Sequence, residues 1–457
     1  MAIDHNIFRL YDIRGIAGQN LTAETAYLLG RALGTYFTAR DAPAVLVGHD
    51  NRVSSPWLKE EVIKGLVEGG MRVWDIGVTA TPVFYYLRLL WGLDAGVMVT
   101  ASHNPPEYNG FKLTSGPSSI YGNDLLGILA IMEAREFPTG QGMRRYVSPH
   151  EDYLDMYRQK IRLGPRRLKI VVDCGHGCAS LYAPGLFREL GVDVIPLYCE
   201  LDSRFPAHVP DPSDPGNLRD LQKAVREHNA DAGIAFDGDA DRLTVVDENA
   251  AIIWGDILQI LFWRELMPKF PQSPALVEVK SSQALWDELV RLGGRPQFIP
   301  TGNVIVKAKM RELEVPFAGE MSGHMFFADE YFGYDDGIYA AGRLLRLLSN
   351  TDKTLSGLLA DVPKYYATPE AKAACADSVK FGVIAKLQDY FARKYPVITV
   401  DGARVQFPDG FGLVRASNTQ PALILRAEAR TEAGLSRIQA ALSSALAEFP
   451  EIGPVRW

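Results

Sequence analysis

The chain has 457 residues, of which 47% are hydrophobic and 23% are charged. At about 150 residues per domain, this length predicts three or four domains. A net charge of −7 argues against a general nucleic-acid binder, and no apolar stretch is long enough for a membrane helix. The first residues lack a signal-peptide pattern, and four cysteines are too few for a disulfide framework, so we expect a cytoplasmic protein.

Helices and strands alternate in the first third of the chain. Helical periodicity covers residues 22–38 and 54–68, the second helix with Ser54 or Ser55 as its N-cap. Strands are predicted at 44–48, 71–76 and 96–99, with another helix after Thr81. This alternation is typical of a three-layer α/β domain with a mostly parallel sheet.

A polar segment, residues 100–112, follows the apolar strand at 96–99. Open α/β sheets bind ligands at the carboxyl ends of their strands. The segment offers the Ser102 hydroxyl, the His103 imidazole, the Asn104 amide and the Lys112 ammonium group, and Gly110 permits a tight return. The Gly-x-Ser-x-Gly elbow of the α/β-hydrolases is absent, so phosphoryl transfer at Ser102 is favoured over acyl chemistry. The other interpretation is a polar loop with an incidental serine.

A second α/β unit begins near residue 149, with strands at 169–173 and 232–236 and a helix from 218 to about 229. Cys174 and Cys178 flank Gly-His-Gly after the first strand. Their spacing is not that of a zinc site, so we predict a glycine-rich turn from strand to helix.

Three aspartates, Asp237, Asp239 and Asp241, follow the strand at 232–236. Closely spaced carboxylates suit Mg²⁺ or Ca²⁺. An EF-hand requires glycine where Arg242 stands, and the flanking residues resemble strands rather than helices. Mg²⁺ beside a phosphate is favoured over a solvated acidic turn.

A third unit starts near residue 251 and contains a strand at 275–279, helices at 283–292 and from 303, and a long helix ending near 348. Between these helices lies a loop with Glu320, Ser322 and His324, suited to sugar hydroxyls or forming a plain turn. The tripeptide Asp-Ala-Gly occurs before both Ser102 and Asp237, which is weak support for an internal repeat.

The last unit begins near residue 363. It contains a helix at 383–394, strands at 397–400 and 422–426, a hairpin at 407–412 and a closing alanine-rich helix. Its polar segment supplies a guanidinium, hydroxyls and an amide that suit a phosphate dianion: Arg415, Ser417, Asn418 and Thr419.

Together, the four polar segments resemble the α-D-phosphohexomutase family in order and spacing. Residues 100–105 are similar to its phosphoserine loop, 237–242 to its magnesium loop, 319–324 to its sugar-binding loop and 415–419 to its phosphate-binding loop. Met321 and residues 11–15 resemble the bacterial phosphomannomutase/phosphoglucomutase branch, whereas phosphoglucosamine mutases typically have glutamine at the position of Met321. Asn303 departs from the histidine common in that branch.

The resemblance implies an α/β fold of four domains around a central cleft. The first three would be three-layer domains with mixed sheets of similar topology, and the fourth a smaller α+β domain. Their predicted bounds are 1–148 for the phosphoserine-loop domain, 149–250 for the metal-binding domain, 251–363 for the sugar-binding domain and 364–457 for the phosphate-binding domain.

The activity implied is the reversible interconversion of hexose 1-phosphate and hexose 6-phosphate, for mannose and glucose, through phosphoserine and a hexose 1,6-bisphosphate that also acts as activator. Ser102, His103, Lys112 and Arg242 would be catalytic, and Ser102 would join the three aspartates in binding Mg²⁺. The substrate-binding residues implied are Tyr11, Arg14, Asn104, Lys280, Asn303, Glu320, Ser322, His324, Arg415, Ser417, Asn418 and Thr419.

Three alternatives stay open: a phosphoglucosamine mutase, a metal-dependent sugar phosphatase, and a non-catalytic sensor of sugar phosphates. The expected partners are small sugar phosphates, with no nucleic acid and no membrane, and the protein would be a monomer or weak dimer.

Overall fold

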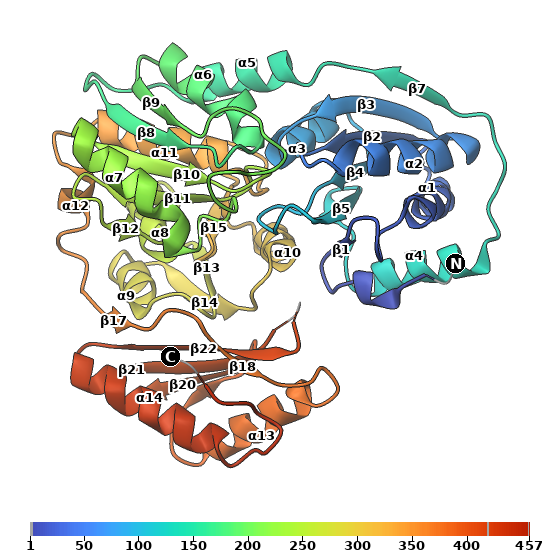
Figure 1. Cartoon of the computed structure of the whole chain (residues 1–457). Helices are drawn as coiled ribbons and strands as arrows, with labels where there is room; N and C mark the ends of the chain where they lie inside the picture. The colour runs from blue at the N-terminus through green and yellow to red at the C-terminus, as the bar shows by residue number, and fades with distance from the viewer. Residues whose placement is uncertain (1–2, 418–419, 456) are drawn as a thin grey trace. The chain divides into compact units, whose positions relative to one another are not determined.

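The computed structural model describes residues 3–417, 420–455 and 457. The chain divides into two compact units: residues 1–255 with 322–358, and residues 256–321 with 359–457. Among the described residues, every helix is too short or too polar to span a bilayer. Figure 1 labels the helices and strands of both units.

The first unit opens with a mixed sheet in the order β1-β5-β4-β2-β3-β7, with β6 paired to β5. β2, β3, β4 and β7 are parallel, whereas β5 is antiparallel to both β4 and β1. Its strands are β1 (Ile13–Ile16), β2 (Ala44–His49), β3 (Arg72–Val78), β4 (Ala95–Val99), β5 (Tyr108–Ser115), β6 (Ser118–Ser119) and β7 (Met143–Tyr146).

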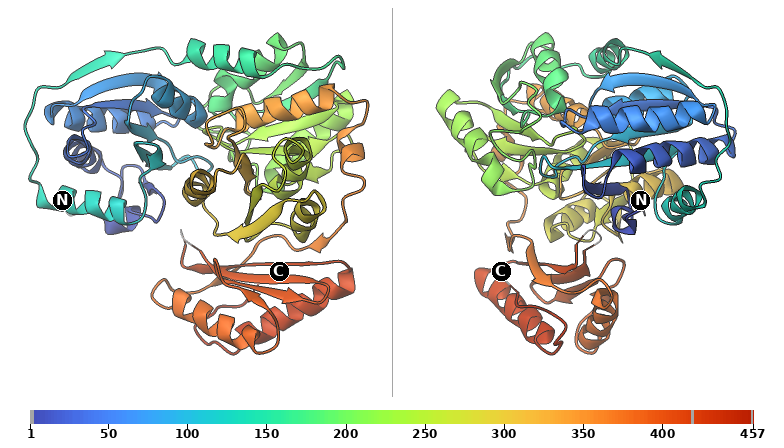
Figure 2. Two further views of the ribbon diagram at one scale, coloured as in Figure 1. Left: turned by 180° about the vertical axis from the view of Figure 1, so that it is seen from behind. Right: turned by 45° about the vertical axis from the view of Figure 1, so that its right-hand side comes forward.

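Helices cover both faces of this sheet. They are α1 (Ala23–Thr38), α2 (Ser55–Glu68), α3 (Thr81–Leu90) and α4 (Asn123–Ala134), after a short 3₁₀ helix at His5–Ile7. α1 and α2 run side by side (Figure 2) and share a core with Val45 and Val47 of β2. Leu46, between them, points to the opposite face of the sheet and is buried as well. Both faces of the sheet are therefore covered. The predicted three-layer arrangement is therefore confirmed.

The second sheet of this unit has the order β12-β11-β10-β8-β9, with β11 antiparallel to its neighbours. Its strands are β8 (Lys169–Asp173), β9 (Asp193–Leu197), β10 (Ala232–Phe236), β11 (Leu243–Asp247) and β12 (Ile252–Ile253). The remaining elements of the unit are α5 (His150–Lys160), α6 (Ala183–Glu189), α7 (Arg219–His228), α11 (Gly337–Ser349), α12 (Leu355–Leu358), strand β16 (Met325–Phe327) and 3₁₀ helices at Cys178–Leu181 and Pro215–Leu218.

The second unit begins with β13 (Pro274–Glu278), which pairs in parallel with β14 (Arg295–Ile299) and β15 (Phe317–Gly319). Its helices here are α8 (Gly255–Leu266), α9 (Gln283–Arg291) and α10 (Asn303–Leu313). The strand neighbours β4-β2-β3, β10-β8-β9 and β15-β13-β14 follow one pattern, so three successive stretches of the chain share a topology. Ser102, Asp237 and Glu320 follow the corresponding strands β4, β10 and β15.

The rest of the second unit is an antiparallel sheet in the order β17-β22-β21-β20-β19, with β18 also paired to β22. α13 (Lys380–Ala392) and α14 (Glu432–Leu446) cover one face of it (Figures 1 and 2). Its strands are β17 (Tyr366–Ala367), β18 (Ala371–Ala374), β19 (Val397–Ile398), β20 (Ala403–Phe407), β21 (Gly410–Ala416) and β22 (Ala422–Ala429). The chain therefore has the predicted α/β folds and a fourth, α+β fold.

Two local predictions were wrong. Gly110 and Lys112 do not lie in the turn after Ser102 but on strand β5, which β4 and β1 hold on both sides. The predicted strand at 397–400 is only the two residues of β19, because the backbone bends from Val400 onward and Gly402 has a positive φ of 85°.

Candidate active site

Ser102 lies in the turn after β4, in the left-handed region at φ 50°. Its backbone N–H donates to Thr100 Oγ1 at 2.9 Å, which stabilises this unusual conformation. The hydroxyl donates to Asp237 Oδ2 at 2.6 Å and lies 3.2 Å from His103 Nδ1. The predicted nucleophile is thus 2% exposed and in contact with the predicted metal loop.

A buried arginine that sequence reasoning missed holds the loop of Ser102. The guanidinium of Arg52 donates to four carbonyl oxygens: those of Ser102 at 2.8 Å, Asn104 at 2.5 Å, Pro105 at 2.6 Å and Tyr108 at 3.1 Å. Its Nε donates to Asp50 Oδ2 at 3.2 Å. Asp50 and Arg52 both follow β2, the strand beside β4. Polar residues at the end of β2 were therefore the sequence signal that could have identified this arginine.

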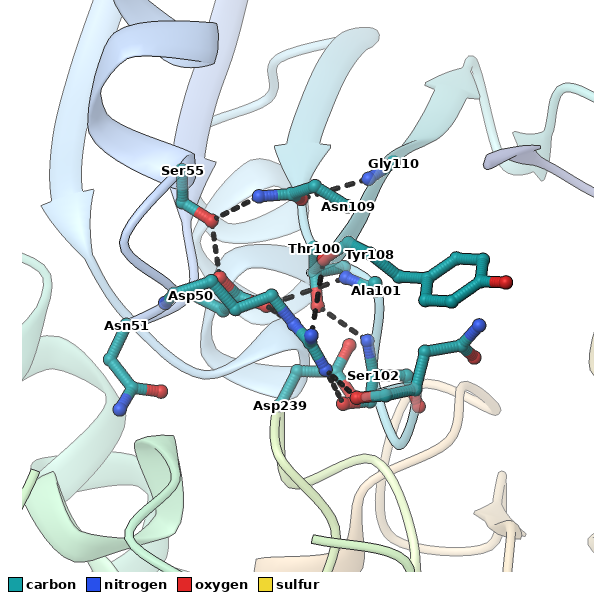
Figure 3. A network of polar contacts seen from close by, with 12 residues as sticks. Asp50, Asn51, Ser55, Thr100, Ala101, Ser102, Tyr108, Asn109, Gly110 and Asp239 are labelled. Carbon is teal, nitrogen blue, oxygen red and sulfur yellow. Dashed lines mark hydrogen bonds and ion pairs between the residues drawn. The ribbon is translucent and has the colours of Figure 1, made fainter. Parts of the chain in front are cut away.

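The predicted N-cap serines of α2 have another role in this network (Figure 3). Neither the cap residue Ser54 nor Ser55 makes a capping bond; both hydroxyls accept from Asn109 Nδ2 at 2.8 Å, and Ser55 Oγ in turn donates to Asp50 Oδ1. The N-cap function is absent because these hydroxyls face β5 instead of the first turn of the helix. They tie α2 to the strand that carries Lys112.

The metal loop follows β10 and brings three fully buried carboxylates together. One oxygen from each of Asp237, Asp239 and Asp241 lies within 4.8 Å of the others. Ala240 has φ 65°, and a Cβ on Gly238 would stand 2.5 Å from the Ser102 carbonyl oxygen. Only glycine at position 238 lets the two loops approach this closely.

Lys112 compensates much of this negative charge. Its Nζ donates to Asp239 Oδ2 at 2.6 Å and also to Asp241 Oδ2. Burial alone would raise the pKa of Asp239, but Lys112 lowers it below its usual value. The pKa of Asp237 is raised well above its usual value by burial and by the charges of Asp241 and Asp239.

The aspartates have coordination capacity left for a cation. Within the part of the chain that the structure describes, neither Asp239 Oδ1 nor Asp241 Oδ1 receives a hydrogen bond, although both are buried. Leaving such oxygens without a donor is costly. A hard divalent cation that prefers carboxylate oxygens fits this donor set.

His324, in the loop after β15, adds an imidazole to this group of side chains. Arg242 Nε donates to His324 Nε2 at 2.8 Å, and His324 Nδ1 lies 3.0 Å from Asp335 Oδ2. Since Nε2 accepts, the ring proton is on Nδ1, facing Asp335. Arg242 in turn donates its backbone N–H to Asp237 Oδ1 at 3.1 Å, so this group is linked to the metal loop.

Two more predicted residues lie beside the serine loop. Arg14 on β1 donates to Asn104 Oδ1 at 2.7 Å and to Asp12 at 2.5 Å. Burial, with the positive charges of Arg242 and Arg14, holds the pKa of His103 well below its usual value. The predicted residue Tyr11 precedes β1 and is partly buried.

In the second unit, Glu320 is buried and its Oε1 accepts from the backbone of Gly302 at 2.8 Å. Lys280 pairs with Glu370 at 2.9 Å and with Glu278 at 3.4 Å. Glu278, which sequence reasoning missed, also accepts from Thr301 Oγ1 and from the backbone N–H of Met321, both at 2.8 Å. This carboxylate at the end of β13 therefore ties the segment before α10 to the Glu320 loop.

Arg415 lies on strand β21, not in the loop after it. Its Nε donates to Asp401 Oδ2 at 2.9 Å, while its buried Nη2 has no acceptor among the described residues. A buried guanidinium N–H of this kind is suited to an anion. Ser417 follows β21, and its Oγ accepts from the backbone of Gln420 at 3.1 Å; Asn418 and Thr419 lie outside the described residues.

Asn303 is the first residue of α10, after Gly302 with φ 138°. Ser322 belongs to the first unit and Glu320 to the second, so the predicted sugar loop crosses the division between units. The first unit thus brings together Ser102, His103, Lys112, the three aspartates, Arg242 and His324. The second unit carries Lys280, Asn303, Glu320, Arg415 and Ser417.

Four domain models of one family match the chain in order. They are the phosphoglucomutase/phosphomannomutase α/β/α domains I, II and III, at residues 5–138, 151–251 and 254–366, and the C-terminal domain, at 360–445. These matches agree with four domains, while our own boundaries stay predictions.

Relatives match over nearly the whole length. A phosphomannomutase/phosphoglucomutase of Pseudomonas aeruginosa is 43% identical over 451 residues, 98% of this chain and 97% of its own. A phosphoglucomutase of Neisseria meningitidis is 39% identical, covering 98% of each chain. A crystal structure of a phosphoglucomutase/phosphomannomutase family protein from Burkholderia thailandensis is 38% identical, with a TM-score of 0.92 and full coverage of both chains. The chain therefore belongs to the phosphoglucomutase/phosphomannomutase family of phosphohexomutases.

Proposed function

We propose that this enzyme interconverts the 1- and 6-phosphates of glucose and mannose by way of phosphorylated Ser102 and a hexose 1,6-bisphosphate. The observation that carries the proposal is the 2.6 Å bond from Ser102 Oγ to Asp237. It places a buried hydroxyl against three carboxylates, a combination suited to phosphoryl transfer and poorly suited to acyl transfer. The bisphosphate would be both the intermediate and, when added, the activator that phosphorylates Ser102.

Mg²⁺ is the cation proposed for the carboxylates, held by Asp237, Asp239, Asp241 and an oxygen on Ser102. When bound, it would neutralise charge on the transferring phosphoryl group. The two carboxylate oxygens without a hydrogen-bond donor support this assignment.

Three side chains are proposed to assist the transfer. His103 lies 3.2 Å from Ser102 Oγ and its lowered pKa keeps it neutral near pH 7, so Nδ1 can accept the hydroxyl proton. Although burial opposes its charge, the carboxylates of Asp239 and Asp241 raise the pKa of Lys112, which keeps it positive beside the phosphoryl group. Arg242, held by His324 Nε2, supplies a second positive charge.

The remaining residues are proposed to bind the substrate. Glu320 and Ser322 would bind the sugar hydroxyls, and Arg415 with Ser417 the phosphate that does not react. Arg415 Nη2 is a buried donor available for that phosphate. The other members of the proposed substrate site are Tyr11, Arg14, Asn104, Lys280, Asn303, His324, Asn418 and Thr419.

Two other activities make different predictions. A sugar phosphatase would pass the phosphoryl group of Ser102 to water, whereas a mutase must exclude water. A phosphoglucosamine mutase would prefer the amino sugar; a probable phosphoglucosamine mutase of Methanopyrus kandleri is 37% identical to this chain. Met321, which stands where phosphoglucosamine mutases typically have glutamine, favours the neutral sugars.

A coupled assay on glucose, mannose and glucosamine 1-phosphates, with Mg²⁺ and a trace of glucose 1,6-bisphosphate, tests the proposal. We expect hexose 6-phosphate from the first two sugars, with little inorganic phosphate. Incubation with bisphosphate alone should add one phosphate to the peptide containing Ser102. Ser102→Ala should lose that label, whereas Ser436→Ala, at an exposed position on α14, should keep it. Stoichiometric label on another residue would refute the phosphoserine.

We also propose that the enzyme acts in the cytoplasm as a monomer or weak dimer. All four cysteines are free thiols in the structure, which is typical of proteins in reducing compartments. Sedimentation velocity over a range of concentrations would measure the oligomeric state.

A further inference from the structure

Two cysteines distant in sequence meet at the end of the second sheet. Cys174 follows β8 and Cys199 lies two residues beyond β9, the parallel neighbour of β8. The backbone N–H of Cys174 donates to Leu197 O at 3.1 Å, which fixes the two strand ends together. Their sulfur atoms are 3.2 Å apart. A disulfide has an S–S distance of about 2.05 Å, so closure requires a movement of roughly 1 Å.

The two thiols differ in accessibility and acidity. Cys174 is fully buried, whereas Cys199 is partly exposed. Burial raises the pKa of Cys174, while the contact with Cys174 lowers the pKa of Cys199. Cys199 is therefore the thiol that ionises and meets a solution oxidant first, and Cys174 lies behind it.

The other two cysteines are placed differently. Cys178 is buried, with its sulfur 3.7 Å from Asn51 Oδ1, and Cys375 is buried in the second unit. Neither has a sulfur neighbour in the described part of the chain. They serve as internal controls for any reaction of the pair.

We propose that Cys174 and Cys199 form an oxidisable thiol pair, which a small-molecule disulfide such as oxidised glutathione converts to an intramolecular disulfide that slows the mutase reaction. The Cys199 thiolate attacks one sulfur of the glutathione disulfide and releases one glutathione thiolate. Cys174 then loses its proton and attacks Cys199 Sγ, releasing the second glutathione. Two protein thiols and one glutathione disulfide thus become one protein disulfide and two glutathione molecules.

The position of Cys174 connects this reaction to catalysis, and this part rests on the function proposed above. Residues 174–177 form a turn, and Cys178, which begins the 3₁₀ helix after it, donates its backbone N–H to Gly238 O at 2.9 Å. A Cβ on Gly177 would stand 2.7 Å from that same oxygen, so the turn touches the metal loop directly. A further bond joins Asn51 Nδ2 to His176 O at 2.8 Å. Since small displacements of reacting groups are costly, we expect kcat to fall about fivefold in the disulfide form.

The test uses the full-length enzyme, treated with oxidised glutathione and then quenched with an alkylating agent. Peptide mapping should show Cys174 linked to Cys199, with Cys178 and Cys375 alkylated. Cys174→Ser should instead retain one glutathionyl group on Cys199, because the second attack is lost. Cys199→Ser should form neither product. The activity of the wild type should fall about fivefold and return with dithiothreitol, whereas Cys375→Ser should behave as the wild type.

Peptide mapping tests whether the disulfide forms, and the activity measurement tests its effect on catalysis. Absence of the Cys174–Cys199 link under conditions that glutathionylate Cys199 in Cys174→Ser would overturn the pair. A complete disulfide with unchanged kcat would overturn the effect on catalysis. If the reduced enzyme lacks mutase activity while the disulfide still forms, the proposed function fails and the thiol pair stands.

Discussion

The acidic side chains of the metal loop, which are proposed to bind the cation, are buried at some cost to the folded protein. Asp237 shows this most clearly, because burial and two neighbouring carboxylates raise its pKa. We expect Asp237→Asn to lower kcat by at least about 100-fold, since one ligand is lost. In EDTA the same variant should be as stable as the wild type or about 1 kcal/mol more stable, because one buried charge is removed.

Urea unfolding in EDTA and calorimetric titration with Mg²⁺ would measure both effects. Asp231→Asn provides a control: Asp231 is a partly buried carboxylate that pairs with Arg166, away from the metal loop. The Asp231→Asn protein should be less stable than the wild type but should keep its affinity for Mg²⁺. Full activity of Asp237→Asn without metal would contradict the role given to the loop.

Asp336 is expected to make the stability of the folded protein depend on pH. Asp336 caps α11, accepts from Tyr153 and Tyr331, and has its pKa raised by burial to about 6. A carboxyl whose folded pKa lies above the unfolded value binds its proton more tightly when folded. This group therefore adds stability as the pH falls through 6, and that stability is lost as the pH rises.

Between pH 7 and pH 5, the wild type should gain about 1 kcal/mol in unfolding free energy relative to Asp336→Asn, which cannot titrate. Denaturant titrations of both proteins at the two pH values give this difference. A difference of the opposite sign would show that Asp336 is not the titrating group.

At the scale of elements, the serine loop and the metal loop approach each other closely at Gly238. Gly238→Ala would place a Cβ 2.5 Å from Ser102 O and push the metal loop away from the serine. We expect kcat to fall by about 10- to 100-fold with a nearly normal circular dichroism spectrum. Gly185→Ala is the matched control: Gly185 lies on α6 with open space around its Cβ position, so the change should be neutral or stabilise by about 0.5 kcal/mol. Equal kcat values for the two variants would contradict this role of the contact.

Residues that are contiguous in sequence could be assigned to the site, whereas residues with distant partners could not. The serine and aspartate loops are contiguous motifs after apolar strands, so their chemistry could be inferred from local sequence. Arg52 could not be assigned, because its partners at Ser102 and Tyr108 are 50 and 56 residues away. The strand that holds Lys112 was mistaken for a loop, since the polar Asn109, Lys112 and Thr114 hide the apolar pattern of β5.

At the scale of the whole molecule, the proposed mechanism requires the bisphosphate to bind in two orientations, so that either phosphate can reach Ser102. The 3- and 4-hydroxyls of the sugar are both equatorial and can exchange places against the same carboxylate. The 2-position, where glucose and mannose differ, moves between environments. We therefore expect kcat/KM for glucose 1-phosphate and mannose 1-phosphate to agree within about tenfold, or about 1.4 kcal/mol.

Steady-state assays on both sugars would measure this ratio. If the ratio of the two kcat/KM values is large, Asn303 is the residue to test, because its amide at the start of α10 could favour one epimer. Asn303→His should then bring the two values closer. A preference above about 100-fold, unaffected by that change, would refute dual specificity.

The division into units also has a consequence for synthesis on the ribosome. Residues 322–358 belong to the first unit, although residues 256–321 of the second precede them. They include α11, whose cap and first turn bond the hydroxyls of Tyr153 and Tyr157. A nascent chain that has emerged only to residue 255 lacks these acceptors for the two hydroxyls. The first unit therefore completes its core only after residue 358 has left the ribosome, before all of residues 359–457 has emerged.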